Sequence, residues 1–228
     1  MPRPKPLDWL VLAGLVIAWG SAFGALKIAV QDISPVWNTV IRLWVASGTL
    51  AVVCLMNRAA LPPLLPRPHV AWGYYAVIGT IGLAAPFYLF AFAAKGIPSA
   101  VNAICNGASP IFTAALALAV LREEQLGALA STAVAVVYEP PMTAWPSPAS
   151  TAAVVSLGVF PTALAGIGYV FLVQRQGPVF MSMAIYLAPL WATALGVLLL
   201  GERPGWPAYA ALALILGGVA LATTTRKA

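Results

Sequence analysis

Hydrophobic positions fall in long blocks along this chain, and short polar segments rich in proline, glycine and charge separate them. A helix that crosses the roughly 30 Å hydrocarbon core of a bilayer needs about 20 mainly apolar residues, because it rises about 1.5 Å per residue. The pattern therefore predicts an all-α, polytopic membrane protein. Eight spans are expected, at residues 9–30, 36–56, 70–94, 99–121, 126–137, 151–173, 179–200 and 206–222.

The fifth run, residues 126–137, is shorter than the others. As a helix it would extend about 18 Å, which is less than the bilayer core. Either this span draws on the proline-rich loop that follows it, or the region is incomplete. The first run is longer than the core of a signal peptide and is followed by further spans, so we expect it to be retained in the protein.

Composition agrees with a membrane protein. Hydrophobic residues make up 61% of the 228 residues and charged residues 8%, whereas soluble domains have about a quarter charged. The 12 basic residues are mostly scattered singly at the ends of apolar runs, which excludes a nucleic-acid-binding patch. Cys54 and Cys105 lie inside apolar runs without metal-ligand spacing, so we expect no metal or cofactor. The expected partners are the lipid bilayer and a small-molecule substrate, with the chain a monomer or weak homodimer.

The basic residues also predict which side of the membrane each loop faces, because cytoplasmic loops are enriched in Lys and Arg. With eight alternating spans and a cytoplasmic N-terminus, only Lys95 and Arg203 fall in outer loops. Both termini are then cytoplasmic. The basic residues on the inner side are Arg3, Lys5, Arg58, Arg67, Arg122, Arg175, Arg226 and Lys227.

A helical unit occurs twice in the chain. Pro110 in the fourth span and Glu123 just after it match Pro189 and Glu202, each 79 residues later. The loop assignment places Glu123 inside and Glu202 outside, so the two copies have opposite orientations. Inverted repeats are typical of transporters, which bind substrate near the midplane between the halves.

These features resemble a known family. The segments Trp19 to Phe23 and Ile41 to Leu43, together with the duplicated unit, resemble the EamA-type branch of the drug/metabolite transporter superfamily. The resemblance implies ten helices in two inverted five-helix repeats. It also implies efflux of amino acids or related small metabolites across the inner membrane.

The chain departs from that pattern in length. An offset near 80 residues is too short for a five-helix unit, and residues 151–173 resemble the family's eighth helix following directly on the fifth. We therefore expect residues 1–138 to form the first repeat, with spans one to five, and residues 139–228 to form a second repeat that lacks two helices. Because two spans cross the membrane and return, removing both leaves every remaining loop on the same side of the membrane.

The fourth span carries a polar stripe. Its members are three or four residues apart and so share one helix face: Ser99, Asn102, Asn106, Ser109 and Thr113. Amides offer donors and acceptors to a zwitterionic substrate without burying an ion. The alternative is that these residues join helices by hydrogen bonds of about 0.6 kcal/mol each.

Two aromatic residues are further candidates for the substrate site. Tyr186 lies on a polar face of the 179–200 span, where it is suited to stack on a substrate or donate its hydroxyl. A buried structural tyrosine is the alternative. Trp19 lies deep in the first span, away from the interface where tryptophan is enriched, which favours a cavity role.

Lys27 and Arg42 are basic residues near the membrane interior, within about seven residues of the outer ends of their spans. In the structural interpretation, both side chains extend to the interface, as long basic side chains do. In the functional interpretation, Arg42 binds a substrate carboxylate or gates the outer mouth. Glu202 precedes the last span, where a carboxylate favours the helix dipole.

No Asp or Glu lies in the middle of a predicted span, which favours a facilitative transporter or exchanger over an ion-coupled one. Alternating access would use the helices weakened by mid-span prolines at 86, 110, 161 and 189. The rival interpretations are a non-transporting membrane scaffold and an ion-coupled drug or metabolite exporter. An enzyme is not expected, because no activated nucleophile or acid pair is evident.

Overall fold

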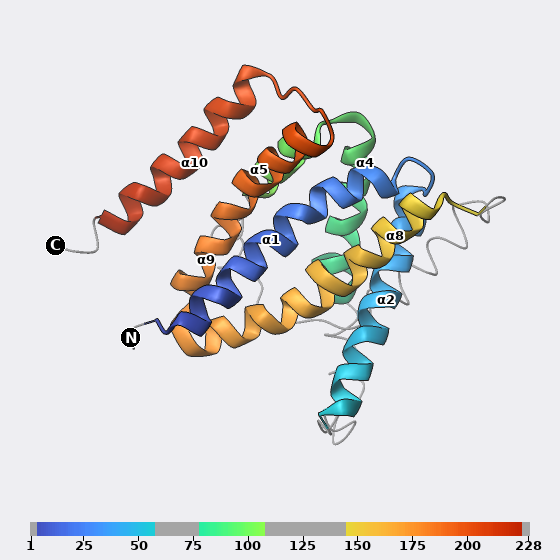
Figure 1. Ribbon diagram of the computed structural model, residues 1–228, viewed down its shortest axis with the longest axis horizontal. Coiled ribbons are helices and arrows are strands. Elements are labelled where there is room, and N and C mark those ends of the chain that lie inside the picture. The colour runs from blue at the N-terminus through green and yellow to red at the C-terminus, as the bar shows by residue number, and fades with distance from the viewer. Residues whose placement is uncertain (1–3, 58–77, 108–144, 225–228) are drawn as a thin grey trace. The chain divides into compact units, whose positions relative to one another are not determined.

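The computed structural model describes residues 4–57, 78–107 and 145–224, in which every regular element is helical (Figure 1). Two of these elements, η1 and η2, are π-helical. The elements are α1 (Pro6–Ala29), α2 (Pro35–Met56), η1 (Ile78–Ala84), α4 (Ala85–Gly96), α5 (Ser99–Gly107), α8 (Pro148–Leu157), η2 (Gly158–Leu164), α9 (Ala165–Leu199) and α10 (Trp206–Thr224).

Helices long and apolar enough to cross a membrane occur at four places in the described part of the chain. These are Pro6–Ala29, Pro35–Met56, Pro148–Pro178 and Phe180–Leu199, which match four of the predicted runs. The helical fold class is therefore confirmed for these segments. The count of eight spans and the ten-helix architecture stay predictions, because the run at 126–137 and parts of two others lie outside the described residues.

Serine and proline set where two of these helices begin. Ser34 caps α2 by accepting a hydrogen bond from the Trp37 amide at 3.4 Å, and Pro35 follows it. Ser147 caps α8 in the same way through the Ser150 amide at 3.2 Å, again with proline next. A capping hydroxyl pairs an amide that the helix leaves free, and proline at the first position has no amide to lose.

The chain forms two compact units, and each draws segments from both halves of the sequence. The first unit contains Met1–Gly24, Gly96–Leu118 and Ala165–Ala228. The second unit contains Ala25–Lys95 and Ala119–Leu164. The predicted division into repeats at residue 138 is a division of the sequence, and it stays a prediction.

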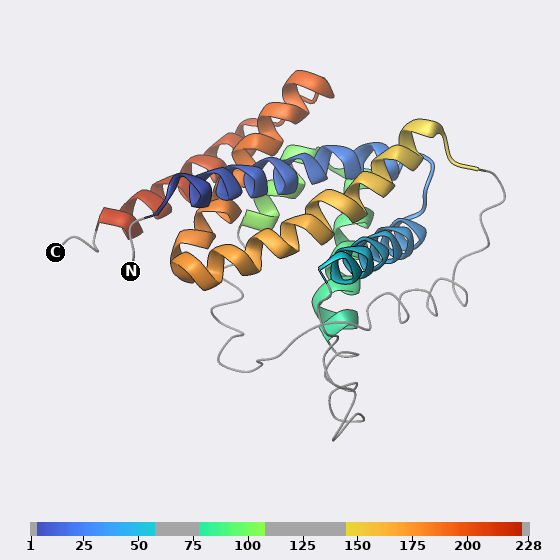
Figure 2. The ribbon, with the colours of Figure 1, turned by 60° about the horizontal axis from the view of Figure 1, so that its bottom comes forward.

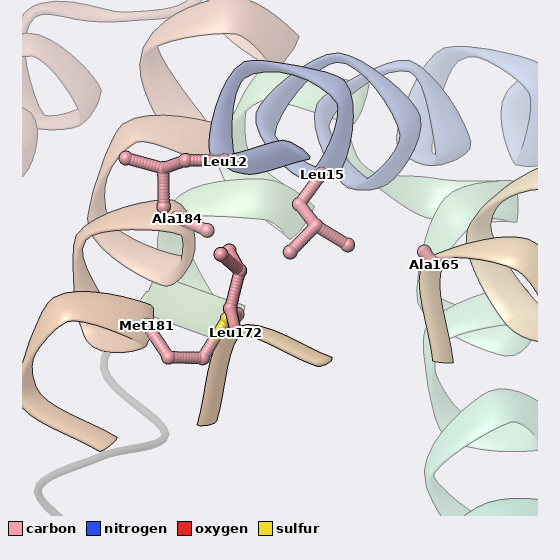
Figure 3. Packing of buried hydrophobic residues seen from close by; sticks show 6 residues of the cluster. All are labelled: Leu12, Leu15, Ala165, Leu172, Met181 and Ala184. Atoms are coloured by element: carbon pink, nitrogen blue, oxygen red, sulfur yellow. The ribbon is translucent and has the colours of Figure 1, made fainter. Parts of the chain in front are cut away.

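The core of the first unit lies where α1 meets the two arms of α9. Gly177 separates these arms with a φ of 81°, a conformation that glycine adopts without steric cost. Leu12 and Leu15 of α1 belong to one buried cluster with Leu172 of the first arm and Met181 of the second (Figure 3). Because the chain reverses at Gly177, both arms contribute to the same core.

Glycine allows close helix packing in each unit. A Cβ atom at Gly20 of α1 would lie 2.8 Å from the carbonyl oxygen of Ala188 in α9. In the second unit, where α2 packs against α8 and η2 (Figure 2), a Cβ atom at Gly158 would lie 2.6 Å from the Cβ of Val45. Both contacts bring helix backbones together, as small residues do in membrane helices.

Candidate functional site

Both π-helical segments of the second unit lie beside a proline. Pro161 is inside η2, and Pro86 follows the end of η1 by two residues. Proline has no amide hydrogen, so it cannot donate to the carbonyl four residues earlier. In η2 that carbonyl, of Leu157, instead accepts a hydrogen bond from the Thr162 hydroxyl at 2.7 Å. Single π-helical turns within α-helices are frequent at functional sites.

Arg42 of α2 contacts the neighbourhood of both prolines. Its Nε donates a hydrogen bond to the Thr162 hydroxyl oxygen at 2.8 Å, next to Pro161. Its guanidinium carbon lies 3.7 Å from the centroid of the Phe87 ring, next to Pro86. The residue is only 7% exposed. Arg42 is therefore an interior residue that links two irregular helices.

The positive charge of Arg42 has no carboxylate partner among the described residues, where the ion pair that occurs joins Arg175 to Asp8. One turn before Arg42 lies Asn38, which is 1% exposed. Within the described residues its side-chain nitrogen has no hydrogen-bond partner. Residues four apart on a helix share a face, so α2 carries two buried donors side by side.

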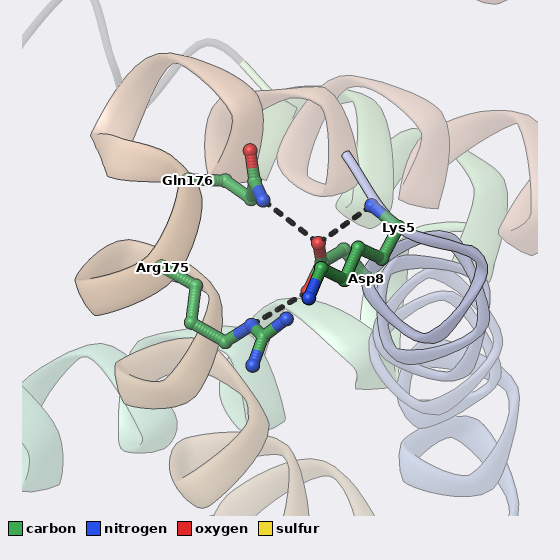
Figure 4. A network of polar contacts seen from close by, with 4 residues as sticks. All are labelled: Lys5, Asp8, Arg175 and Gln176. Atoms are coloured by element: carbon green, nitrogen blue, oxygen red, sulfur yellow. Dashed lines mark hydrogen bonds and ion pairs between the residues drawn. The ribbon is translucent and has the colours of Figure 1, made fainter. Parts of the chain in front are cut away.

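In the first unit, the buried charge at the start of α1 is paired. The Asp8 carboxylate is fully buried and accepts hydrogen bonds from Arg175 Nε at 2.9 Å and Gln176 Nε2 at 2.7 Å. The backbone amide of Lys5 donates a third at 2.9 Å. Figure 4 shows the two α9 side chains pointing at Asp8 from beside the Gly177 reversal. This network joins α1 to α9, and both oxygens of the Asp8 carboxylate accept hydrogen bonds in it.

Glu202 makes a similar closed network at the start of α5. Its Oε1 accepts from the Ser99 amide at 2.8 Å, and its Oε2 accepts from the Ser99 hydroxyl at 2.8 Å. The sequence assigned Glu202 to the dipole of the helix that follows it. That assignment is wrong, because the carboxylate caps α5 instead, as an N-terminal acceptor. Ser99, expected in the polar stripe, is used for this cap.

The amides of the stripe lie on α5. Asn102 is 2% exposed and Asn106 is partly buried. The helix packs against α9, which carries the partly buried Tyr186. Ser109 lies outside the described residues. The first unit thus carries amide and phenol groups on two helices that pack together.

Comparison with known proteins identifies the family. The model of the EamA-like transporter family matches this chain twice, over residues 8–137 and 125–224. The chain belongs to the EamA-like transporter family. Together with its apolar helices, this makes it a multi-pass membrane protein.

An uncharacterized transporter of Archaeoglobus fulgidus is 28% identical to this EamA-like protein over 115 residues. Those residues are 50% of this chain and 39% of that transporter, so the match spans well under half of the relative's length. No solved structure matches the chain.

The predicted binding residues of this EamA-like chain are divided between the two units. Trp19, Asn102, Asn106 and Tyr186 belong to the first unit, and Arg42 belongs to the second. The Trp19 ring lies in a tilted arrangement 6.3 Å from the Tyr169 ring of α9. Their part in substrate binding stays a prediction.

Arg42 of this EamA-like protein is buried within the second unit against Thr162 and Phe87, and its placement at the membrane interface stays a prediction. Lys27 is likewise bonded within the unit, through its Nζ to the carbonyl oxygen of Ala94 at 2.8 Å. There it lies near the C-terminal end of α4, where the helix dipole favours a cation.

Sequence reasoning missed Asn38, Phe87 and Thr162. The signals were present, since Asn38 precedes Arg42 by one turn, and Phe87 and Thr162 each follow a mid-span proline. The sequence pattern does not show that α2 packs against both η1 and η2. That packing brings these residues close to Arg42.

Proposed function

We propose that this protein transports amino acids or related small metabolites out of the cytoplasm by alternating access. It would reside in the inner membrane with both termini cytoplasmic, as the distribution of basic residues predicts. Membership of the EamA-like transporter family supports transport over the scaffold alternative.

The polar face of α5 carries this proposal. Asn102 is buried in the first unit, whose main hydrophobic cluster is built from leucine, alanine and methionine. Its helix is held by the Glu202 cap, which keeps the two amides at a set position along the helix axis. Buried amides on an anchored helix are suited to bind the polar groups of a small zwitterion.

The position of the carboxylates supports a facilitative transporter or exchanger. The described residues contain three acidic side chains, Asp8, Asp32 and Glu202. Asp8 lies in the first turn of α1 and the others lie between helices. Proton- or sodium-coupled transporters usually place a carboxylate within the membrane, and the described helices have none at their centres.

The helix irregularities give alternating access a structural basis. Turns that lack regular hydrogen bonds bend more easily than an unbroken helix, and both η1 and η2 occur in helices of the second unit. The reversal at Gly177 serves the same purpose in the first unit.

The test is uptake of radiolabelled amino acids into proteoliposomes, with and without an imposed proton gradient. We expect saturable flux that does not depend on the gradient. The double variant Asn102→Leu with Asn106→Leu should lower that flux at least about tenfold, because leucine keeps the branching of the side chain and removes the hydrogen bonds.

Asn57→Leu is the matched control, since Asn57 is exposed at the end of α2 and bonds only its own helix at Val53. Its flux should equal that of the wild type. Unchanged flux in the double variant would contradict the role of α5. Absence of flux from folded wild-type protein would favour the scaffold.

A further inference from the structure

We infer that Arg42 and Asn38 form an anion site that binds the carboxylate group of a small organic acid, an inference that builds on the proposed transport of small metabolites. The site lies in the second unit, on the face of α2 that meets η2 and the Pro86 region. Asn38, Phe87 and Thr162 are its new members.

The guanidinium of Arg42 is held in place through its Nε edge and one of its faces. The Thr162 hydroxyl oxygen accepts a hydrogen bond from Nε, and the Phe87 ring covers a face of the guanidinium. An arginine has five N–H donors in a planar fork, and the bond to Thr162 uses one of them, so we assign the terminal amino groups, for which the described residues show no bond, to a ligand. Two parallel hydrogen bonds from that edge match the two oxygens of a carboxylate.

Asn38 is the independent observation that points to a ligand. The large majority of buried side-chain polar atoms in proteins have a hydrogen-bond partner, yet the Asn38 side-chain nitrogen has none in the part of the chain that the structure describes. A buried donor without a partner costs free energy as long as the site is empty. A ligand that supplies an acceptor removes this cost when it binds. A ligand oxygen beside Arg42 would supply that acceptor.

The chemistry of the two residues selects a singly charged anion. Both side chains present hydrogen-bond donors, and among the described residues no carboxylate pairs with Arg42 to neutralise it. A cation would be repelled. One guanidinium balances one negative charge, so a carboxylate fits better than a phosphate, which at neutral pH carries more than one.

A purely structural role for Arg42 makes a different prediction for Asn38. If the arginine only connected η2 to Phe87, the Asn38 amide would have no use in an apolar setting. Replacing it by leucine would then be neutral or stabilising and would leave ligand binding unchanged. The anion site predicts the same stability but weaker binding.

The experiment measures stabilisation of the purified full chain in detergent by four probes. These are leucine, 4-methylpentanoate, which lacks the amino group, 3-methylbutylamine, which lacks the carboxylate, and inorganic phosphate. A ligand that binds the native state raises the melting temperature. We expect leucine and 4-methylpentanoate to do so, and the amine and phosphate not to.

Affinity for 4-methylpentanoate should fall about 10- to 100-fold in Asn38→Leu and in Arg42→Gln, the range expected for a hydrogen bond to a charged group. Arg42→Lys should retain part of the affinity, because it keeps the charge but loses the fork. Asn57→Leu and Arg203→Gln are matched controls at exposed positions and should bind as the wild type does.

Several results would overturn the site. They are equal stabilisation by the amine and the acid, stabilisation by no carboxylate, and unchanged affinity in both Asn38→Leu and Arg42→Gln. Leucine flux that the amine inhibits as well as leucine would leave the proposed transport intact and remove the site. Acid binding that depends on Asn38 and Arg42, without amino-acid flux, would support the site and contradict amino-acid transport.

Discussion

The two units differ in what surrounds their buried charge. In the first unit Asp8 and Glu202 each accept several hydrogen bonds, and Asp8 also pairs with Arg175. In the second unit Arg42 is equally interior, yet it bonds a hydroxyl and an aromatic ring and has an unpaired amide beside it. A buried charge whose hydrogen bonds are all made within the protein is costly to disrupt. A buried charge with donors that the described residues do not use can bind a ligand.

This difference separates stability from binding in a way that mutations can test. Changes to the saturated networks should lower stability and leave ligand selectivity alone. Changes near Arg42 should affect selectivity.

Alanine at Gly20 or at Gly158 should give the largest loss of stability. Either Cβ would lie less than 3 Å from backbone or β-carbon atoms, so a helix must shift. Overpacking of this kind costs about 1–3 kcal/mol. Thermal unfolding in detergent measures the loss. Only Gly158→Ala should also weaken 4-methylpentanoate binding, because its new Cβ would press on the Arg42 carbonyl oxygen at 2.8 Å.

Gly14→Ala is the control for both variants. Nothing lies within 4 Å of a Cβ at Gly14, so alanine should be neutral or stabilise the helix by up to about 1 kcal/mol. Equal loss of acid binding in Gly20→Ala and Gly158→Ala would show that packing anywhere disturbs the site. The contrast between the units would then not hold.

Removing the Glu202 cap should have a smaller effect, on stability alone. Glu202→Ala leaves the Ser99 amide and hydroxyl without their acceptor, and loss of a helix cap costs about 1–2 kcal/mol. Glu202→Gln keeps one acceptor oxygen and should lose less. Melting temperature measures both losses, and the preference for acid over amine among folded molecules should not change. A changed preference would assign Glu202 to the binding site.

The sequence predicted the helices well but the site only in part. Twenty-residue apolar runs are local signals, so the bounds of α2 were predicted to within one residue, whereas α8 begins at Pro148, three residues before the predicted run. Gly20 and Gly24 have the GxxxG spacing that permits close helix contact, and Gly20 does lie close to Ala188. These features depend on neighbours in sequence.

Non-local contacts account for what the sequence did not predict. Glu202 reaches Ser99 across 103 residues, and Arg42 reaches Thr162 across 120. Helical periodicity places a residue on a face but does not say which distant helix covers that face. The unpaired Asn38 amide is likewise visible only once its surroundings are known.

The smallest predicted effect concerns Asp32, an exposed residue in the turn between α1 and α2. Hydrogen bonds from Ser147 and from the Ser150 hydroxyl, which lies 2.7 Å from Asp32 Oδ2, hold the pKa of Asp32 below its ordinary value of 3.8. The folded protein therefore binds this proton less readily than the unfolded chain. The stabilisation is complete above the ordinary pKa and is lost as pH falls through the lowered value.

We expect the wild type to melt above Asp32→Asn by a constant margin at pH values over about 5, and the margin to shrink as the pH falls below about 4. Melting curves of both proteins across this range measure it. Ser150→Ala should reduce the margin at neutral pH, because it removes the shortest of these hydrogen bonds. A margin that stays constant to the lowest pH would mean that Asp32 ionisation does not contribute. The turn would then be held by packing alone, unlike the charged networks of the first unit.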